Sequence, residues 1–154
     1  MKRLHYLLFF SILACVFPFV GCNDEKKHKY DIEDVFSNDT FNSIMEGEVV
    51  PVEIKYGIGG VAGYHQFSTK DSDMINAYIK AFRVLKIKQV ITNEEDMTFI
   101  FDGIEDYSFI MEDGTTVVVG TNLSTYVLDR ERNIQFVLGH NDKLHELNRK
   151  IRQH

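Results

Sequence analysis

Cysteine is nearly absent from this chain of 154 residues. Its two cysteines, Cys15 and Cys22, both lie within the first 22 residues. No disulfide framework can therefore hold the later residues together, and no thiol among them can act as a nucleophile. The folded part of the chain must depend on its hydrophobic core, and about 130 residues are enough to build one.

Positively charged residues are also fewer than negatively charged ones. Lys and Arg number 17 against 23 Asp and Glu, which gives a formal net charge of −6. Neutralising the phosphates of a nucleic acid takes clusters of Lys and Arg, so the composition excludes a general nucleic-acid binder. The acidic residues occur in small, scattered groups, which is typical of a solvated surface.

Common catalytic and metal-binding motifs are missing too. The serines have no G-x-S-x-G context, and the chain contains no H-E-x-x-H motif, no EF-hand loop and no P-loop. His140 and His145 are five residues apart, which does not match the i, i+4 spacing of two metal ligands on a helix. We therefore predict no catalytic residue, no metal site and no cofactor.

Acidic side chains leave one catalytic alternative open. Three acidic groups, Glu94-Glu95-Asp96, Glu105-Asp106 and Glu112-Asp113, fall in expected turns. Two carboxylates brought together by the fold could act on a glycosidic bond. A small hydrolase that combines such carboxylates with His65 or His140 is therefore the enzymatic alternative to a binding protein.

The one long apolar run lies at the N-terminus. Met1-Lys2-Arg3 gives a basic start, and the run that follows is LHYLLFFSILACVFPFV. This run is shorter than the roughly 20 residues that a membrane-spanning helix needs, and Pro18 interrupts its end. A basic start, an apolar middle and a small residue at the exit are typical of a secretory signal peptide, with a transmembrane anchor as the alternative.

The end of the apolar run carries a short motif. Phe19-Val20-Gly21-Cys22 resembles the lipobox of bacterial lipoproteins, in which apolar and small residues precede an invariant cysteine. Phe19 stands where that family usually has leucine. The resemblance implies that a signal peptidase removes residues 1–21 and that the thiol of Cys22 carries diacylglycerol. It covers the first 22 residues and implies nothing about the folded domain.

The lipid sets the expected location. Stable anchoring takes more than one acyl chain, at about 0.8 kcal/mol per buried methylene, and a lipoprotein cysteine carries at least two. We therefore expect a protein anchored in the cell membrane or the outer membrane, with its domain outside the cytoplasm. Asn23-Asp24-Glu25 resembles the acidic export signal of surface lipoproteins in some Bacteroidota, whereas Lys26-Lys27-His28-Lys29 suits the spacer of a Gram-positive lipoprotein.

The rest of the chain is predicted to be a tether followed by one domain. Residues 22–47, which include the lipidated cysteine, are polar and acidic, and their first residues are expected to hold the domain off the bilayer. The helical spacing of Ile32, Val35 and Phe36 predicts a short helix within this tether. Residues 48–154 are predicted to form the single folded domain.

A hairpin and a helix are expected at the start of this domain. Residues 49–56 and 61–68 are predicted to pair as a β-hairpin, with the glycines between them making a tight reversal. Alternation in the first strand places one set on a common face: Val50, Val52, Ile54 and Tyr56. A helix is expected to begin at Thr69 or Asp71, because apolar residues then recur at helical spacing. These are Ile75, Tyr78, Ile79, Phe82 and Leu85.

Short strands separated by turn residues follow, and a helix closes the chain. The strands are predicted at 86–92, 97–102, 106–111, 115–119, 125–128 and 133–138, and the closing helix at 141–153. Together these elements predict an α+β fold. It consists of one antiparallel sheet of five to seven strands, built as a hairpin, a helix and a meander, with a C-terminal helix.

The predicted meander has two unequal faces. One face is strongly apolar and should pack against the helices. The other is also partly apolar, through Ile100, Ile110, Val118 and Tyr126. Either the C-terminal helix or the tether covers this second face, or it is a surface that binds a partner.

A glycine cluster, KYGIGGVAGYHQF, is the most unusual stretch of the domain. Its glycines allow positive φ angles or close approach to a ligand, and successive amides in such a loop can bind an anion. The candidate ligand-binding residues are Gly57, Gly59, Gly60, Gly63, Tyr64 and His65. The alternative is a hairpin tip or bulge with no ligand.

These observations favour binding over catalysis. We expect a lipid-anchored protein of the cell envelope that contacts the membrane through Cys22 and binds a protein partner. A small envelope hydrolase and an inhibitory or structural envelope module are the alternatives.

Overall fold

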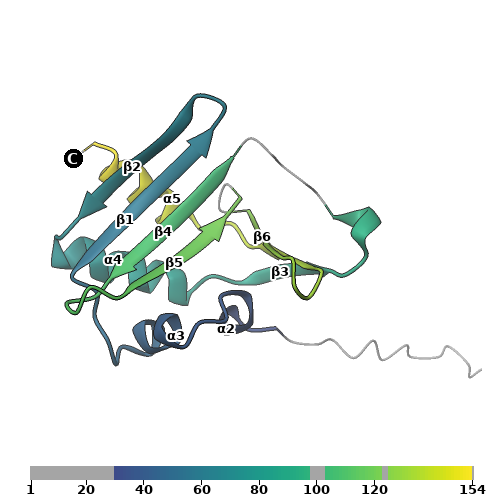
Figure 1. The fold of residues 1–154 in the computed structure, drawn as a ribbon, viewed down its shortest axis with the longest axis horizontal. Helices are drawn as coiled ribbons and strands as arrows, with labels where there is room; N and C mark the ends of the chain where they lie inside the picture. The colour runs from purple at the N-terminus through teal and green to yellow at the C-terminus, as the bar shows by residue number, and fades with distance from the viewer. Residues whose placement is uncertain (1–29, 98–102, 123–124, 154) are drawn as a thin grey trace, which may run out of the picture.

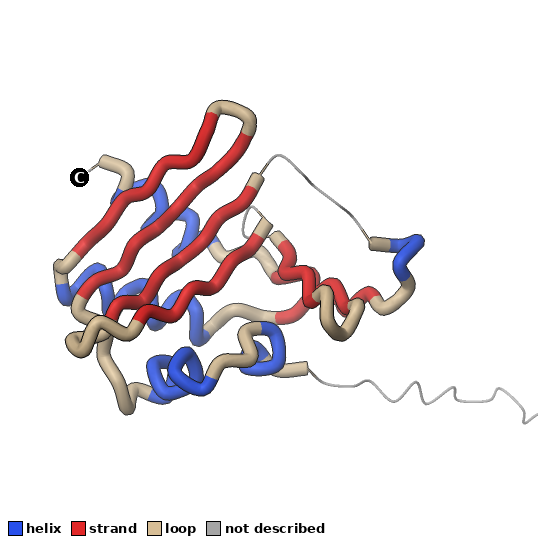
Figure 2. The backbone as a smooth tube through the Cα atoms, in the orientation of Figure 1, coloured by secondary structure: helices blue, strands red, loops and turns tan. Residues whose placement is uncertain are grey.

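The computed structural model describes residues 30–97, 103–122 and 125–153. Within these residues the chain forms four α-helices, one short 3-10 helix and seven strands, so the predicted α+β fold is confirmed (Figures 1 and 2). The strands are divided between two antiparallel sheets rather than one. The signal peptide, Cys22 and the first residues of the tether lie outside the described residues, as does most of the strand predicted at 97–102.

The larger sheet has the strand order β2-β1-β4-β5. Its first hairpin joins β1 (Glu53–Gly60) to β2 (Gly63–Thr69), and its second joins β4 (Ile104–Ile110) to β5 (Thr116–Thr121). The predicted hairpins are therefore present, but β1 starts and ends later than expected. Val50 and Val52 precede the strand and are 61% and 44% exposed, so the prediction that they share a strand face with Ile54 and Tyr56 is wrong.

A second, smaller sheet lies beside the larger one. Its order is β3-β7-β6, formed by β3 (Ile87–Ile91), β7 (Ile134–Leu138) and β6 (Tyr126–Asp129). The β6–β7 turn contains Asn133 at φ 52°, a left-handed conformation that asparagine tolerates better than most residues. The short 3-10 helix η1 (Glu94–Asp96) follows β3.

Helix α4 (Ser72–Arg83) confirms the predicted apolar stripe. The Asp71 side chain caps its N-terminus by accepting a hydrogen bond from the Met74 backbone at 2.8 Å. Helix α5 (Asp142–Ile151) is capped in the same way by Asn141, whose amide also donates to the Ala81 carbonyl at 2.8 Å. This cap therefore joins the two helices, which lie on the same side of the larger sheet (Figure 1).

Part of the predicted tether belongs to the folded domain. Residues from 32 onward form α2 (Ile32–Val35), which matches the expected short helix, and α3 (Asp39–Glu46), which was not expected. The side chains of Phe41 and Ile44 are fully buried in the main core. Residues 32–46 therefore pack as part of the domain instead of spacing it from a membrane.

The core lies between the larger sheet and the helices. Phe82 of α4 is fully buried at its centre, with its ring 5.0 Å from that of Tyr107 and 5.5 Å from that of Phe109. Phe41 of α3 joins the same cluster, 6.0 Å from Phe82. Edge-to-face contacts of this kind add about 0.5–1.5 kcal/mol per pair beyond the burial of apolar area.

Polar side chains are also buried between the sheet and the helices. The Tyr56 hydroxyl donates to Glu105 at 2.5 Å, and Asn148 of α5 donates to the Tyr107 hydroxyl at 2.8 Å. Tyr78 of α4 donates to the same Asn148 at 3.2 Å. Burial raises the pKa of both Tyr56 and Tyr78, and the bond to Glu105 raises that of Tyr56 further, so both remain protonated donors.

Candidate functional site

The larger sheet has one face packed against the helices and one face directed away from them. In β5 the burial alternates, so that Val117 and Val119 are buried while Val118 between them is 61% exposed. Of the residues expected on the second face, Val118 is thus exposed and Ile110 of β4 is half-buried. Tyr126 is buried in the smaller sheet, and Ile100 lies outside the described residues. We call the side away from the helices the outer face.

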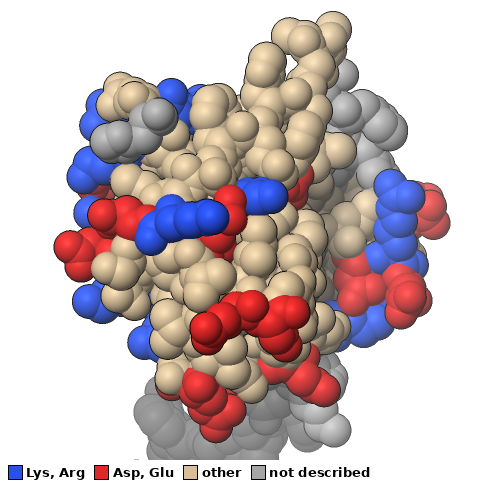
Figure 3. Space-filling model, turned by 60° about the vertical axis from the view of Figure 1, so that its left-hand side comes forward, with Lys and Arg blue, Asp and Glu red and all other residues tan. Residues whose placement is uncertain are grey.

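The glycine cluster forms a strand rather than the expected reversal. Gly57, Gly59 and Gly60 lie within β1, and Gly63 opens β2 with a φ of 111° that only glycine adopts easily. The reversal itself is therefore made by residues 61 and 62. In the space-filling view this hairpin projects from the molecule and shows no charged side chain near its end (Figure 3).

The glycines of β1 leave room for the ring of Tyr64. Gly59 pairs directly with Tyr64, and Gly57 pairs with Asp106 on the other side of β1. A Cβ atom on Gly57 would lie 2.0 Å from the Tyr64 hydroxyl oxygen and 2.7 Å from Asp106 Oδ1. The tyrosine therefore crosses β1 over a position where any side chain larger than that of glycine would displace it.

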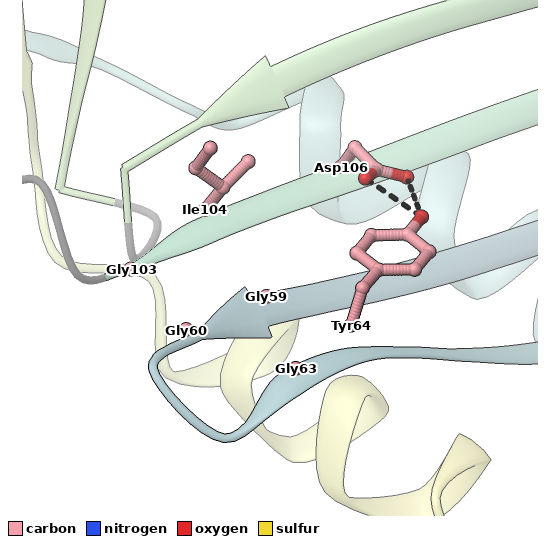
Figure 4. A pocket seen from close by; sticks show the side chains of 7 residues that line it. All are labelled: Gly59, Gly60, Gly63, Tyr64, Gly103, Ile104 and Asp106. Atoms are coloured by element: carbon pink, nitrogen blue, oxygen red, sulfur yellow. Dashed lines mark hydrogen bonds between the residues drawn. The ribbon is translucent and has the colours of Figure 1, made fainter.

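Tyr64 and Asp106 meet on the outer face. The Tyr64 hydroxyl lies 3.0 Å from Oδ1 and 2.8 Å from Oδ2 of Asp106, and it donates to this carboxylate (Figure 4). Slight burial and the bond to Asp106 raise the pKa of Tyr64, which keeps the hydroxyl protonated. None of the described residues forms an ion pair with Asp106.

A hollow of about 510 Å³ opens beside this pair. Tyr64 and Ile104 stand on either side of Gly59 and form its walls, since both pair with that glycine (Figure 4). Glycine backbone makes much of the remaining surface. The lining residues are Gly59, Gly60, Gly63, Tyr64, Gly103, Ile104 and Asp106.

The structure brings most of the predicted ligand-binding residues together. Gly59, Gly60, Gly63 and Tyr64 line the hollow, and Gly57 lies under the tyrosine. His65 does not belong to this group. It pairs with Ile58, which packs against the core, and strand alternation places it on the face opposite Tyr64.

Sequence reasoning missed the partner strand of this site. Glu105-Asp106 was expected as a turn leading into the strand predicted at 106–111, but both residues lie within β4 and point to opposite faces. The signal that could have found Asp106 is the pairing register of β1 with β4, which matches Gly57 to Asp106. That register pairs residues far apart in the sequence. The alternation within a single strand does not show which residues of another strand lie opposite, so the sequence alone did not give this pairing.

Replacing Gly57 by alanine tests the position of Tyr64. We expect the ring to leave β1 and its bond to Asp106 to break, because the new Cβ would overlap the hydroxyl. The backbone should accept alanine, since φ at Gly57 is not positive, and the free energy of unfolding should change by no more than about 1 kcal/mol. The ring signals of Tyr64 in NMR spectra report this displacement.

Gly120→Ala is the matched control for that experiment. Gly120 pairs with Asp106 on the same face, but its added Cβ would lie 3.9 Å from the nearest atom, the carbonyl oxygen of Glu105. Tyr64 should be undisturbed in this variant. Unchanged Tyr64 signals in Gly57→Ala, or equal changes in both variants, would contradict the arrangement described here.

The other residues considered as metal ligands or catalytic groups are dispersed over the structure. The described residues contain no group of three or more His, Cys, Asp or Glu side chains placed to hold a metal ion. The rings of His140 and His145 stack at 5.1 Å, and His140 Nε2 lies 2.7 Å from Asp142 Oδ1 at the exposed start of α5. His140 thus lies just before helix α5, at some distance in the chain from the glycine cluster.

Two further findings bear on the assignment of the chain. No helix among residues 30–97, 103–122 and 125–153 is both long and apolar enough to cross a membrane. Comparisons of the chain with protein-family models, with curated proteins and with solved structures give no match.

Proposed function

We propose that this chain is a lipid-anchored protein of the cell envelope that binds a protein partner through the outer face of its larger sheet. The observation that carries the binding part is the composition of that face. Its exposed side chains include Tyr64 and Ile104, each 54% exposed, and Val118, which is 61% exposed. Tyr64 and Ile104 flank Gly59, and Val118 lies on the neighbouring strand of the same face, where it pairs with Ser108. Exposed apolar side chains on one face of a sheet are typical of a contact surface.

The outer face has a rigid support. The opposite sides of β1, β4 and β5 carry core residues, among them Tyr56, Phe109 and Val119, which are at most 4% exposed. The strands are therefore fixed before a partner arrives, and little conformational entropy is lost on binding. Gly59 of β1 and Gly120 of β5 also leave parts of the face without side chains, so a partner can approach the backbone closely.

The anchoring part of the proposal depends on the resemblance of Phe19-Val20-Gly21-Cys22 to a lipobox. An anchor at Cys22 keeps the domain within a short distance of one membrane. Restriction of this kind raises the effective concentration of any partner held in the same membrane. A modest contact surface on the sheet is then sufficient for function.

Photo-cross-linking in the producing cells tests the binding surface. A photoreactive amino acid at Val118 or at Ile104 should give covalent adducts with a partner, because both side chains project from the outer face. The same group at exposed Asn76 of α4, on the opposite side of the sheet, is the control and should give none. Adducts are detected as bands of higher apparent mass in gel electrophoresis, and the captured protein is identified by mass spectrometry.

The pattern of adducts decides the proposal. The same protein captured from positions 104 and 118, and absent from position 76, supports a partner on the outer face. Equal capture from all three positions, or none from positions 104 and 118, would overturn it.

A further inference from the structure

Among the described residues, the Asp106 carboxylate has a hydroxyl partner and no cation within ion-pair distance. It is half-buried, accepts hydrogen bonds from Tyr64, and pairs with none of the described Lys, Arg or His side chains. The aromatic ring beside it is 54% exposed. A negative charge next to an open aromatic ring attracts a cation both by Coulomb attraction and by cation–π attraction.

We infer that the hollow beside Tyr64 and Asp106 binds a primary ammonium group, which is the side chain of a lysine in the protein partner. The inference rests on the proposed function for the source of that lysine. The hollow itself defines the chemistry, through one carboxylate, one aromatic ring and the apolar side chain of Ile104.

The position of the Tyr64 hydroxyl selects ammonium over guanidinium. The hydroxyl oxygen lies at nearly equal distances, 3.0 and 2.8 Å, from the two oxygens of Asp106. It therefore occupies the position between the oxygens that a guanidinium fork uses when it binds both of them. An ammonium group is a compact charge that needs only one free acceptor site, and each oxygen still has one.

The walls of the hollow suit the four-carbon stem of a lysine. Ile104 stands on one side of Gly59 and the ring of Tyr64 on the other, so the stem can pass between two apolar surfaces. The glycine backbone of residues 59, 60 and 63 leaves the space between them open. Lysine stems commonly lie along apolar surface while the charged end reaches a polar group.

Binding of n-butylammonium to the full chain, purified in a neutral detergent, tests this chemistry. NMR signals of the Gly59 and Gly60 amides and of the Ile104 methyl groups should shift and saturate. Propylguanidinium, which has a similar length and the same charge, should bind about tenfold more weakly, because it is also limited to one contact with Asp106 and its charge is more delocalised than that of ammonium. Asp106→Asn should weaken butylammonium binding about tenfold or more, whereas Asp39→Asn, at an exposed residue of α3, should not change it.

Tyr64→Phe separates this mechanism from general attraction to an acidic surface. The variant keeps the ring but frees the position between the Asp106 oxygens, so propylguanidinium should bind as well as butylammonium or better. An unchanged preference in Tyr64→Phe would overturn the inference. So would equal binding of the two cations to the natural chain, or no saturable shift.

The source of the ammonium group is tested separately from its chemistry. Asp106→Asn should reduce the adducts formed from position 118 about tenfold if a partner lysine occupies the hollow. Adducts that persist in this variant would overturn the partner lysine and leave the proposed function standing. Butylammonium binding in a protein that gives no adducts would instead overturn the proposed function and leave the preference for ammonium.

Discussion

Replacing Cys22 by alanine is expected to move the protein from the membrane fraction of the cell to the soluble fraction. The motif Phe19-Val20-Gly21-Cys22 supplies one thiol for a lipid, and no later residue can replace it, because the chain contains no further cysteine. Incorporation of a radiolabelled fatty acid should disappear in the same variant. Fractionation followed by immunoblotting measures the first effect, and autoradiography measures the second.

The size of this effect follows from the energetics of acyl chains. Each methylene of a lipid adds about 0.8 kcal/mol of membrane affinity, so two chains anchor a protein stably and their loss removes that anchor. Cys15→Ala is the matched control, since Cys15 lies inside the apolar run and is not preceded by the motif. Undiminished fatty-acid labelling of Cys22→Ala, or loss of labelling from Cys15→Ala, would rule out the lipoprotein proposal.

Periodicity predicted the elements whose packing is visible within a single segment. The apolar stripe of α4 includes Ile75, Tyr78 and Phe82, and all three are buried against the sheet. The alternation of β4 and β5 predicted their inner faces equally well, because one side of each strand faces a core. In these elements local pattern and tertiary burial agree.

The sequence did not predict α3, although Phe41 and Ile44 are fully buried there. The segment around them is acidic and polar, so its composition resembles a linker. Its stability comes from contacts with α4 and the sheet, such as the 5.8 Å approach of the Phe41 ring to Phe109. Composition within a segment does not report contacts of that kind.

Only part of the candidate site could be predicted from the sequence. The glycine cluster was recognisable because four glycines fall within residues 57–63, and Tyr64 was included because it follows them directly. Asp106 was not recognisable, because it reaches Tyr64 across β1 through two strand registers. Register depends on the whole sheet, so the carboxylate that gives the hollow its charge became evident only in the structure.

Replacing Phe82 by alanine is expected to lower the free energy of unfolding by about 3–5 kcal/mol, the usual cost of truncating a fully buried phenylalanine. The ring contacts aromatic residues of two other elements, among them Phe41 of α3 and Tyr107 of β4, and also Phe36 just after α2. Its loss leaves a cavity that no single element can fill by moving. Urea denaturation followed by circular dichroism measures the change.

Two further variants make the result interpretable. Phe82→Leu keeps much of the apolar volume, so it should cost less than Phe82→Ala and should fold even if the alanine variant does not. Val84→Ala, two residues along the chain at a side chain that is 62% exposed, should change the free energy of unfolding by no more than about 0.5 kcal/mol. Because α3 contributes Phe41 to the same cluster, amide hydrogen exchange in α3 should rise in Phe82→Ala together with exchange in α4. If α3 kept its protection while α4 lost it, residues 32–46 would not share the core, and the tether would extend to residue 47 as its composition suggests.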